Sequence, residues 1–271
     1  MPHKRWFGPA IAVAVVIGLT ACATANGAGG SSGGSGGSSA GVPRPDHVVI
    51  VIEENHVYTD IYGNRSAPYM TSLADGGALF TQSHGVEHPS EPNYLDLFSG
   101  SNQGVTDDSC PHTFTTPNLA NALIDAKFTF GAYSEDLHSA GSTVCSHLKY
   151  ARKHDPWVNW PSIPGSTAMP FTSFPSDYST LPDVSFVIPN LDDDMHDGSI
   201  SRGDTWLQTK IDGYAQWAKT HNSLLIVTYD EGVGSNQRIY TVFYGQHETR
   251  TRAHSGAGGM FALMRKTLSG S

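Results

Sequence analysis

Short runs of apolar and β-branched residues recur along the chain and predict buried strands. Three of these runs are continuous and strong: 47–52 (HVVIVI), 184–189 (VSFVIP) and 224–229 (LLIVTY). Weaker runs of the same kind lie at 78–83, 128–133 and 239–244. Because the strong runs lack polar alternation, they are typical of strands that are covered on both faces, as in a parallel sheet.

Helical spacing occurs between these runs. In 204–220 an apolar face recurs, formed by Leu207, Ile211, Tyr214, Ala215 and Ala218. Shorter helices are expected at 93–98 and 118–126. This alternation predicts an α/β fold with a mostly parallel central sheet sandwiched by helices. The segment 134–182 is rich in Ser, Pro, His and aromatic residues, and we expect it to form loops over one edge.

The first 22 residues have the pattern of an export signal. Lys4 and Arg5 precede an apolar stretch, 10–19, that is short for a membrane-spanning helix. The following Leu-Thr-Ala-Cys resembles a bacterial lipobox, which predicts cleavage before Cys22 and lipidation of its thiol. A plain secretory signal is the alternative. Either reading predicts an exported protein, and the lipobox anchors it to the membrane of the cell envelope.

Composition divides the remaining chain. A Gly/Ser-rich stretch predicts a flexible tether over 22–41, followed by the folded domain, 42–245, and an atypical tail, 246–271. Only 15% of residues are charged, and 29 Gly and 16 Pro exclude a long helix bundle. The net charge of −9 disfavours nucleic-acid binding, which needs a basic surface. With Cys22 lipidated, Cys110 and Cys145 are expected to form a disulfide in an oxidising compartment.

Polar clusters follow four of the predicted strands. They are 53–55 (EEN), 88–93 (HPSEPN), 190–197 (NLDDDMHD) and 230–232 (DEG). The carboxyl ends of strands in an α/β sheet meet at one edge, where ligands bind. The carboxylates would repel one another there, and a divalent cation would compensate. Oxygen and imidazole ligands without thiolates suit Mg²⁺, Ca²⁺, Mn²⁺ or Zn²⁺.

Ser90 is the candidate nucleophile, because the segment 89–92 leads into the predicted helix 93–98 and makes Ser90 an N-cap-like residue, at a helix start where backbone N–H groups favour an anion. Its alternative role is to cap that helix. Glu53 is expected to be a bystander, because adjacent strand residues point to opposite faces and Glu54 is the better ligand. Asp192 is an alternative ligand one helical turn before His196. His88 is either a site residue or an ordinary loop histidine.

Four segments together resemble a known family: HVVIVIEENHVYTDIYGN, HPSEPNYLDLFSG, VIPNLDDDMHDGS and LLIVTYDEG. They are similar to the bacterial and fungal phosphoesterases, which include acid phosphatases and phospholipase C enzymes and belong to the alkaline phosphatase superfamily. The resemblance covers about residues 46–245. It implies an α/β sandwich with a metal-assisted site for phosphoester hydrolysis.

The resemblance also implies roles for individual residues. A divalent metal ion of unknown identity would be held by Glu54, Asn55, Ser90, Asp230 and Glu231. Catalysis would use Ser90 and His196, and phosphate would be held by Asn93, His154 and Asp194. In this interpretation the metal activates the Ser90 hydroxyl, attack on phosphorus gives a phosphoserine, and a histidine protonates the leaving alkoxide.

The expected function is therefore that of an exported, metal-dependent phosphatase of acid phosphatase type. Its partners would be a small phosphate ester or a phospholipid head group, and the membrane through the lipid anchor. A phospholipase C-like phosphodiesterase is the enzymatic alternative, and an inactive or non-catalytic binding lipoprotein is the alternative of another class. A metal-free serine hydrolase lacks support, because there is no Gly-x-Ser-x-Gly motif.

The tail departs from the family pattern. After Gly245 the family normally continues with an Asn-His-Tyr-Ser-like segment, whose histidine completes the site. No such segment occurs in 246–271, where only His247 and His254 are available as substitutes.

Overall fold

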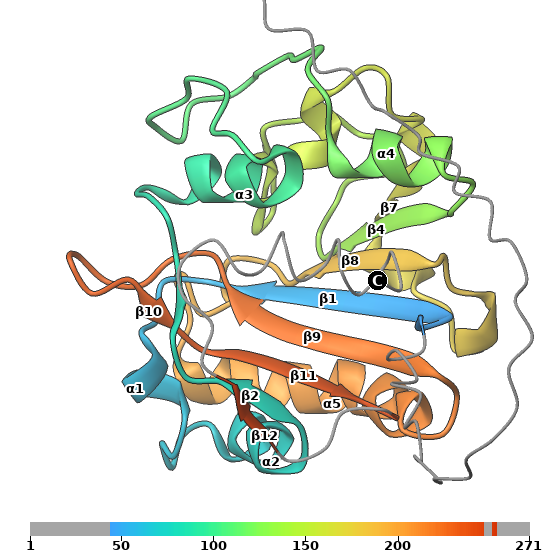
Figure 1. The fold of residues 1–271 in the computed structure, drawn as a ribbon. Coiled ribbons are helices and arrows are strands. Elements are labelled where there is room, and N and C mark those ends of the chain that lie inside the picture. Colours follow the sequence, from blue (N-terminus) through green and yellow to red (C-terminus); the bar gives the residue numbers. More distant parts are fainter. Residues whose placement is uncertain (1–43, 247–250, 254–271) are drawn as a thin grey trace, which may run out of the picture. The chain divides into compact units, whose positions relative to one another are not determined.

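The computed structural model describes residues 44–246 and 251–253. Its centre is an eight-stranded sheet in the order β12-β2-β11-β9-β1-β8-β4-β7 (Figure 1). The strands are β1 His47–Glu53, β2 Ala78–Phe80, β4 Phe130–Ser134, β7 Ala168–Pro170, β8 Val184–Ile188, β9 Ser223–Tyr229, β11 Thr241–Gly245 and β12 Thr251–Ala253. β11 is antiparallel to both of its neighbours, and the other pairings are parallel.

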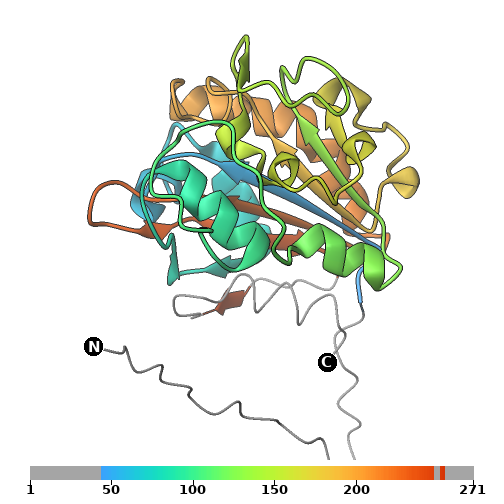
Figure 2. The same cartoon turned by 90° about the horizontal axis from the view of Figure 1, so that it is seen from above.

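Helices cover both faces of this sheet, so the predicted α/β sandwich is confirmed. α2 (Pro68–Gly76) and α5 (Ile200–Ala218) lie on one face, and α3 (Ser90–Ser99) and α4 (Leu119–Asp125) lie on the other (Figures 1 and 2). A short helix, α1 (Tyr58–Ile61), follows β1. Each helical layer packs on its own hydrophobic cluster, and the sheet separates the two clusters.

Strand alternation decides which side chains enter which layer. In β1, Val49 and Val51 pack in the α2/α5 layer, whereas Val48, Ile50 and Ile52 pack in the α3/α4 layer. The same period-two pattern continues to the end of the strand. It therefore directs Glu53 toward the α2/α5 layer and Glu54 toward the α3/α4 layer, as alternation predicts.

Several predicted boundaries are wrong in detail. The run 239–244 divides at Tyr240 into β10 (Arg238–Ile239) and β11, and the run 78–83 divides into β2 and β3 (Ser83–His84). β10 and β3 leave the central sheet and pair with each other. The tail contributes β12, which pairs in parallel with β2 beyond residue 245.

The segment 134–182 is more ordered than the predicted loops. It contains the edge strand β7, a ribbon of β5 (Ser146–His147) with β6 (Tyr150–Ala151), and short 3₁₀ helices. The 3₁₀ helices are η1 Arg152–His154, η2 Pro156–Asn159, η3 Gly165–Thr167, η4 Phe171–Ser173 and η5 Tyr178–Thr180. Such three- and four-residue turns have no 3.6-residue periodicity, so the sequence pattern cannot reveal them.

The predicted disulfide between Cys110 and Cys145 is confirmed. It joins the long connection between α3 and α4 to the residues just before β5. The predicted signal, its lipidation site Cys22 and most of the tether lie outside the described residues. Among the residues that are described, no helix combines the length and apolarity needed to cross a bilayer.

Removal of the disulfide should lower stability, because the crosslink closes a loop between residues separated by 35 positions. For a loop of this size the chain-entropy account gives a loss of about 3–4 kcal/mol in the free energy of unfolding. We expect this loss in a Cys110→Ser/Cys145→Ser variant measured by urea unfolding. Added reductant should leave the unfolding midpoint of the variant unchanged. A variant with the same unfolding midpoint as the wild type would contradict the prediction.

Candidate active site

The carboxylate of Glu54 lies at the end of β1, fully buried against α3. Its Oε2 accepts a hydrogen bond from Ser90 Oγ at 3.0 Å, and its Oε1 accepts one from the Tyr94 hydroxyl at 2.7 Å. Ser90 and Tyr94 are four residues apart on α3, so they lie on one face of the helix, one turn apart. The first turn of α3 is thereby fixed to the end of β1.

Ser90 is the first residue of α3, and Pro89 occupies the cap position. The prediction that Ser90 sits at the cap is thus off by one residue, because Pro89 supplies the extended backbone that precedes the helix. The hydroxyl of Ser90 donates to Glu54 and does not cap the helix. Its capping alternative is therefore excluded by the geometry.

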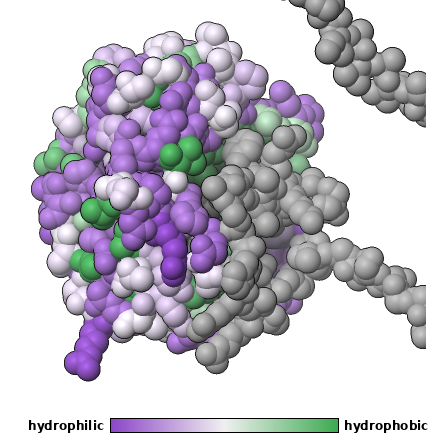
Figure 3. Space-filling view, turned by 60° about the vertical axis from the view of Figure 1, so that its left-hand side comes forward, coloured by the Kyte–Doolittle hydropathy of each residue, from purple (hydrophilic) through white to green (hydrophobic). Residues whose placement is uncertain are grey.

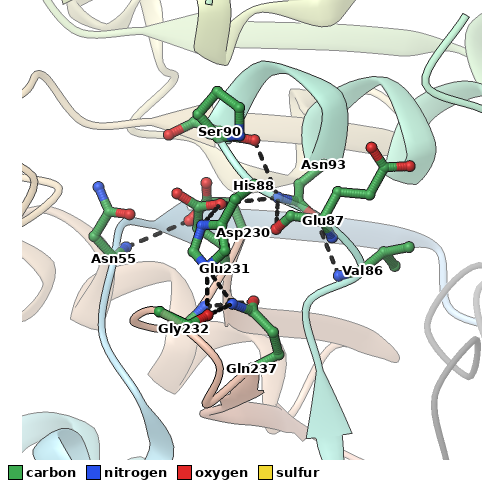
Figure 4. Close-up of polar contacts among 12 residues, drawn as sticks. Asn55, Val86, Glu87, His88, Ser90, Asn93, Asp230, Glu231, Gly232 and Gln237 are labelled. Atoms are coloured by element: carbon green, nitrogen blue, oxygen red, sulfur yellow. Dashed lines mark hydrogen bonds and ion pairs between the residues drawn. The ribbon is translucent and has the colours of Figure 1, made fainter. Parts of the chain in front are cut away.

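Asp230 and Glu231 follow β9 and approach the same place (Figure 4). Asp230 Oδ1 accepts from the backbone N–H of Asn55 at 3.4 Å, whereas Oδ2 is buried without a hydrogen-bond partner among the described residues. Asn55 has a φ of 57°, a left-handed conformation that asparagine tolerates better than most residues. This turn directs its N–H toward Asp230.

Asn93 connects the loop that precedes Ser90, here called the nucleophile loop, to Glu231. Its Oδ1 accepts from the backbone N–H groups of Val86 and Glu87, at 3.0 and 2.8 Å. Its Nδ2 donates to the Glu87 carbonyl at 2.8 Å and to Glu231 Oε2 at 3.1 Å. The same Glu231 oxygen lies 2.6 Å from His88 Nδ1 (Figure 4). The contacts of Asn93 therefore hold the loop that precedes Ser90.

His154 lies between two carboxylates in the protein interior. Its Nε2 is 3.0 Å from Glu54 Oε1, its Nδ1 is 3.3 Å from Asp194 Oδ2, and its ring stacks on Tyr94. Glu54, His154 and Asp194 form a buried group whose ligand atoms lie within 4.8 Å of one another and could hold a metal ion. Burial lowers the pKa of His154 to about 4, so the ring is neutral at pH 7.

His196 is the more accessible histidine, with 29% of its side chain exposed. Its backbone N–H donates to Asp194 Oδ1 at 2.8 Å, its Nδ1 lies 2.9 Å from Asp197, and its Nε2 lies 3.3 Å from Lys153 Nζ. Asp192, the alternative ligand, instead faces Lys149 and Arg202. The structure therefore places His196 beside the site and Asp192 in a separate ion-pair cluster.

The carboxylates of the site are destabilised by burial. Burial, and then repulsion from Glu54 and Glu231, raises the pKa of Asp230 well above its ordinary value. Burial also raises the pKa of Glu54 and Glu231, and it raises the pKa of Asp194 to about 8. Buried acids this close favour a bound cation, and Asp230 Oδ2, which lacks a hydrogen-bond partner within the described part of the chain, is available as an oxygen ligand for one. The residues present therefore fit a divalent metal ion.

The surface around this site is polar. β1 and β9 both end on the left-hand side of Figure 1, and Figure 3 brings that side forward as a largely hydrophilic face with scattered apolar residues. Exposed apolar side chains include Val86 and Val233, from the two loops that carry His88 and Glu231. A polar face of this kind suits a small polar ligand.

The sequence analysis missed several residues of the site. Tyr94 could have been found from its helical spacing to Ser90, and Lys153 from its place beside His154. His88 was left open and proves to contact Glu231. Asp108, which binds Lys153 Nζ at 2.9 Å, gives no signal, because it lies 45 residues away in an irregular loop.

The comparison with protein families decides the identity of the chain. The model of the Phosphoesterase family matches residues 57–258. The chain belongs to the Phosphoesterase family. Membership makes this phosphoesterase a hydrolase of phosphoric esters, as the sequence motifs predict. The match reaches past Gly245 into the tail.

Curated relatives of this phosphoesterase carry phosphatase names. A phosphatidylinositol-3-phosphatase of Mycobacterium tuberculosis is 50% identical over 240 residues, which are 87% of this chain and 80% of that protein. An acid phosphatase of Aspergillus fumigatus is 30% identical over 71% of the chain, and a phosphate-repressible acid phosphatase of Penicillium chrysogenum is 29% identical over 60%. The matches cover 46% and 43% of these two fungal proteins.

The fold of this phosphoesterase is similar to those of several solved structures, one of them described as a member of the alkaline phosphatase superfamily. A superfamily member from Vibrio parahaemolyticus aligns with a TM-score of 0.54 at 11% identity, covering 78% of this chain and 63% of that one. The lipoteichoic acid synthase LtaP of Listeria monocytogenes gives a TM-score of 0.62 at 8% identity, covering 86% and 74%. At these identities the likeness concerns the fold alone.

Glu53 should limit stability at neutral pH. It is fully buried on the opposite face from Glu54, neither oxygen has a hydrogen-bond partner among the described residues, and burial raises its pKa. A raised folded-state pKa costs stability as pH rises above the unfolded value, about 4.3. We therefore expect the free energy of unfolding of Glu53→Gln to equal that of the wild type at low pH. At pH 8 it should exceed the wild-type value by on the order of 1–3 kcal/mol.

Urea unfolding between pH 4 and pH 8 measures this difference. Asp46→Asn, an exposed carboxylate just before the same strand, is the matched control and should behave like the wild type. A constant difference between Glu53→Gln and the wild type at all pH values would contradict the prediction.

Proposed function

We propose that this protein is a metal-dependent phosphatase of acid phosphatase type, in which Ser90 attacks the phosphorus of a phosphate monoester. The observation that carries the proposal is the contact of Ser90 Oγ with Glu54 at the edge of the sheet where Asp230 and Glu231 also end. Family membership and the acid phosphatase relatives support it. All of the proposed nucleophile and ligand side chains are present, which disfavours an inactive or merely binding protein.

Glu54, Asn55, Ser90, Asp230 and Glu231 would hold a divalent metal ion, with Glu54 contributing Oε2. Such an ion lowers the pKa of a bound hydroxyl and neutralises charge on a phosphoryl oxygen. We favour this ligand set over Glu54, His154 and Asp194. The favoured set includes the proposed nucleophile, because Ser90 Oγ contacts Glu54 Oε2, whereas His154 faces Glu54 Oε1. Both sets contain a buried carboxylate oxygen without a hydrogen-bond partner among the described residues, Asp230 Oδ2 in the first and Asp194 Oδ2 in the second.

Two protein groups would guide the proton transfers. Glu54 Oε2 accepts a hydrogen bond from Ser90 Oγ, which orients the hydroxyl, and with a metal ion bound there the hydroxyl proton would pass to water as the oxygen attacks phosphorus. Attack gives a phosphoserine and releases an alkoxide, and His196 is the accessible histidine that would protonate it. Water then hydrolyses the phosphoserine and regenerates Ser90.

The remaining predicted phosphate ligands fit a positioning role. Asp194 is fully buried and contacts His154 and the backbone of His196, and Asn93 holds the nucleophile loop. We propose that Asp194 and His154 orient His196 and Glu54, and that Asn93 orients Ser90.

The natural substrate we propose is the phosphorylated head group of a phosphoinositide, on the basis of the name of the relative that is 50% identical. Export with a lipid at Cys22 would bring the enzyme to a membrane surface, where such head groups are exposed. A phospholipase C-like phosphodiesterase is the second candidate. Turnover of phosphatidylinositol 3-phosphate without turnover of phosphatidylcholine in vesicles would favour the first.

Ser90→Ala should abolish turnover of an aryl phosphate, because it removes the attacking oxygen. We expect a loss of at least about 10³-fold in kcat, as for other enzymes that lose a nucleophile. Ser99→Ala, at the other end of α3, is the matched control and should retain activity. A Ser90→Ala protein with more than a tenth of wild-type kcat would refute the nucleophile.

Removal of divalent metal should abolish activity and reveal the repulsion among the carboxylates. Because burial and repulsion from Glu54 and Glu231 raise the pKa of Asp230, the metal-free protein loses stability as the pH rises above the ordinary aspartate pKa of about 3.9. Metal-free Asp230→Asn should therefore be more stable than the metal-free wild type. Added metal at 100 times its Kd should stabilise the wild type by about 2.7 kcal/mol and leave the variant nearly unchanged.

Unfolding of chelated and metal-reloaded protein measures both effects without an activity assay. Asp125→Asn, an exposed carboxylate on α4, is the control and should gain as much from metal as the wild type. Activity that survives chelation, or an Asp230→Asn variant that metal stabilises fully, would contradict the proposed site.

A further inference from the structure

Lys153 supplies a positive charge at the rim of the site. Its Nζ donates to Asp108 Oδ2 at 2.9 Å and lies 3.3 Å from His196 Nε2, with 16% of the side chain exposed. An ammonium group has three N–H donors. Among the described residues no third partner lies within hydrogen-bonding distance of Nζ, so at least one N–H donor is available to a ligand.

The charge of Lys153 reaches the whole acidic cluster. Its Nζ lies 3.3 Å from His196 Nε2, beside the site, and its positive charge lowers the pKa of Glu54, Asp194 and Glu231. The neighbouring Arg152 is engaged elsewhere, because its guanidinium binds Asn159 and backbone carbonyls. Lys153 is therefore the cationic side chain of this segment that is directed to the site.

Asp108 connects Lys153 to the nucleophile helix. Its Oδ1 accepts from the backbone N–H of Glu91 at 3.0 Å, directly after Ser90, while its Oδ2 binds Lys153. The loop that carries Asp108 is fixed by the Cys110–Cys145 disulfide two residues further on. One carboxylate thus sets the position of the ammonium relative to the first turn of α3.

We propose that Lys153 binds a non-bridging oxygen of the phosphoryl group and makes the site prefer phosphate monoesters over diesters, with Asp108 as its positioning residue. A monoester is a dianion near neutral pH, whereas a diester is a monoanion whose second ester arm replaces one charged oxygen. A fixed ammonium beside the metal ligands gains more from the extra charge of the monoester. The inference rests on the proposed function, since it names the substrate class of the same site.

The test compares an aryl phosphate monoester with a bis-aryl phosphate diester on one preparation of each variant. Lys153→Met should lower the monoester-to-diester ratio of kcat/KM by about 10- to 100-fold, the range for losing a hydrogen bond between charged groups. Inhibition by inorganic phosphate should weaken by a similar factor. Lys153→Arg should retain most of the preference, and Lys149→Met, which removes a lysine paired with Asp192 and Asp197, should leave the ratio unchanged.

A double-mutant cycle tests the role of Asp108. Asp108→Asn should lower the same ratio, and adding it to Lys153→Met should cause no further loss, because the two residues act as one unit. Asp107→Asn, the adjacent exposed carboxylate, is the matched control. Additive losses in the double variant would overturn the positioning role.

The experiments distinguish failure of the proposed function from failure of the proposed role of Lys153. A wild type that hydrolyses neither ester would refute the proposed function and the inference with it. A wild type that hydrolyses the monoester, together with an unchanged ratio in Lys153→Met, would refute the role of Lys153 alone. Because each ratio is measured on a single preparation, the fraction of folded protein does not affect it.

Discussion

The mutual repulsion of buried carboxylates at the ends of β1 and β9 is the constraint that organises this site. Glu54, Asp230 and Glu231 converge there, and burial raises the pKa of each. Hydrogen bonds from Ser90, Tyr94 and Asn93 satisfy part of this cluster. A divalent cation would compensate the remaining negative charge of the carboxylates. The same cation would activate the hydroxyl of Ser90.

The sheet supplies the geometry that this chemistry needs. Alternation along β1 sends Glu54 to the α3 layer and Glu53 to the α5 layer, so adjacent acidic residues have opposite surroundings. Parallel pairing of β9 with β1 brings Asp230 beside them, since the two strands end in register. The helix α3 then crosses above this edge with Ser90 in its first turn. The site therefore depends on strand direction and register more than on any single loop.

Sequence patterns predict the parts of this arrangement that follow from periodicity. The apolar runs locate the parallel strands, and parallel strands bring their carboxyl ends together, so the meeting of Glu54, Ser90 and Asp230 could be foreseen. The contact of Lys153 with Asp108 could not be predicted, because the two residues are 45 positions apart and Asp108 lies in an irregular, disulfide-linked loop. The helix α5 begins earlier than its apolar spacing suggests, because Ser199 caps it before that spacing starts.

The central claim is that a metal ion joins Glu54 and Asp230 to the hydroxyl of Ser90. A crystal structure of the protein loaded with Mn²⁺, with the ion located by anomalous diffraction, tests this claim most directly. The account predicts an ion bound by Glu54 Oε2, Asp230 and Glu231, with Ser90 Oγ among its ligands. An ion held instead by Glu54, His154 and Asp194, with Ser90 outside its coordination sphere, would contradict the account.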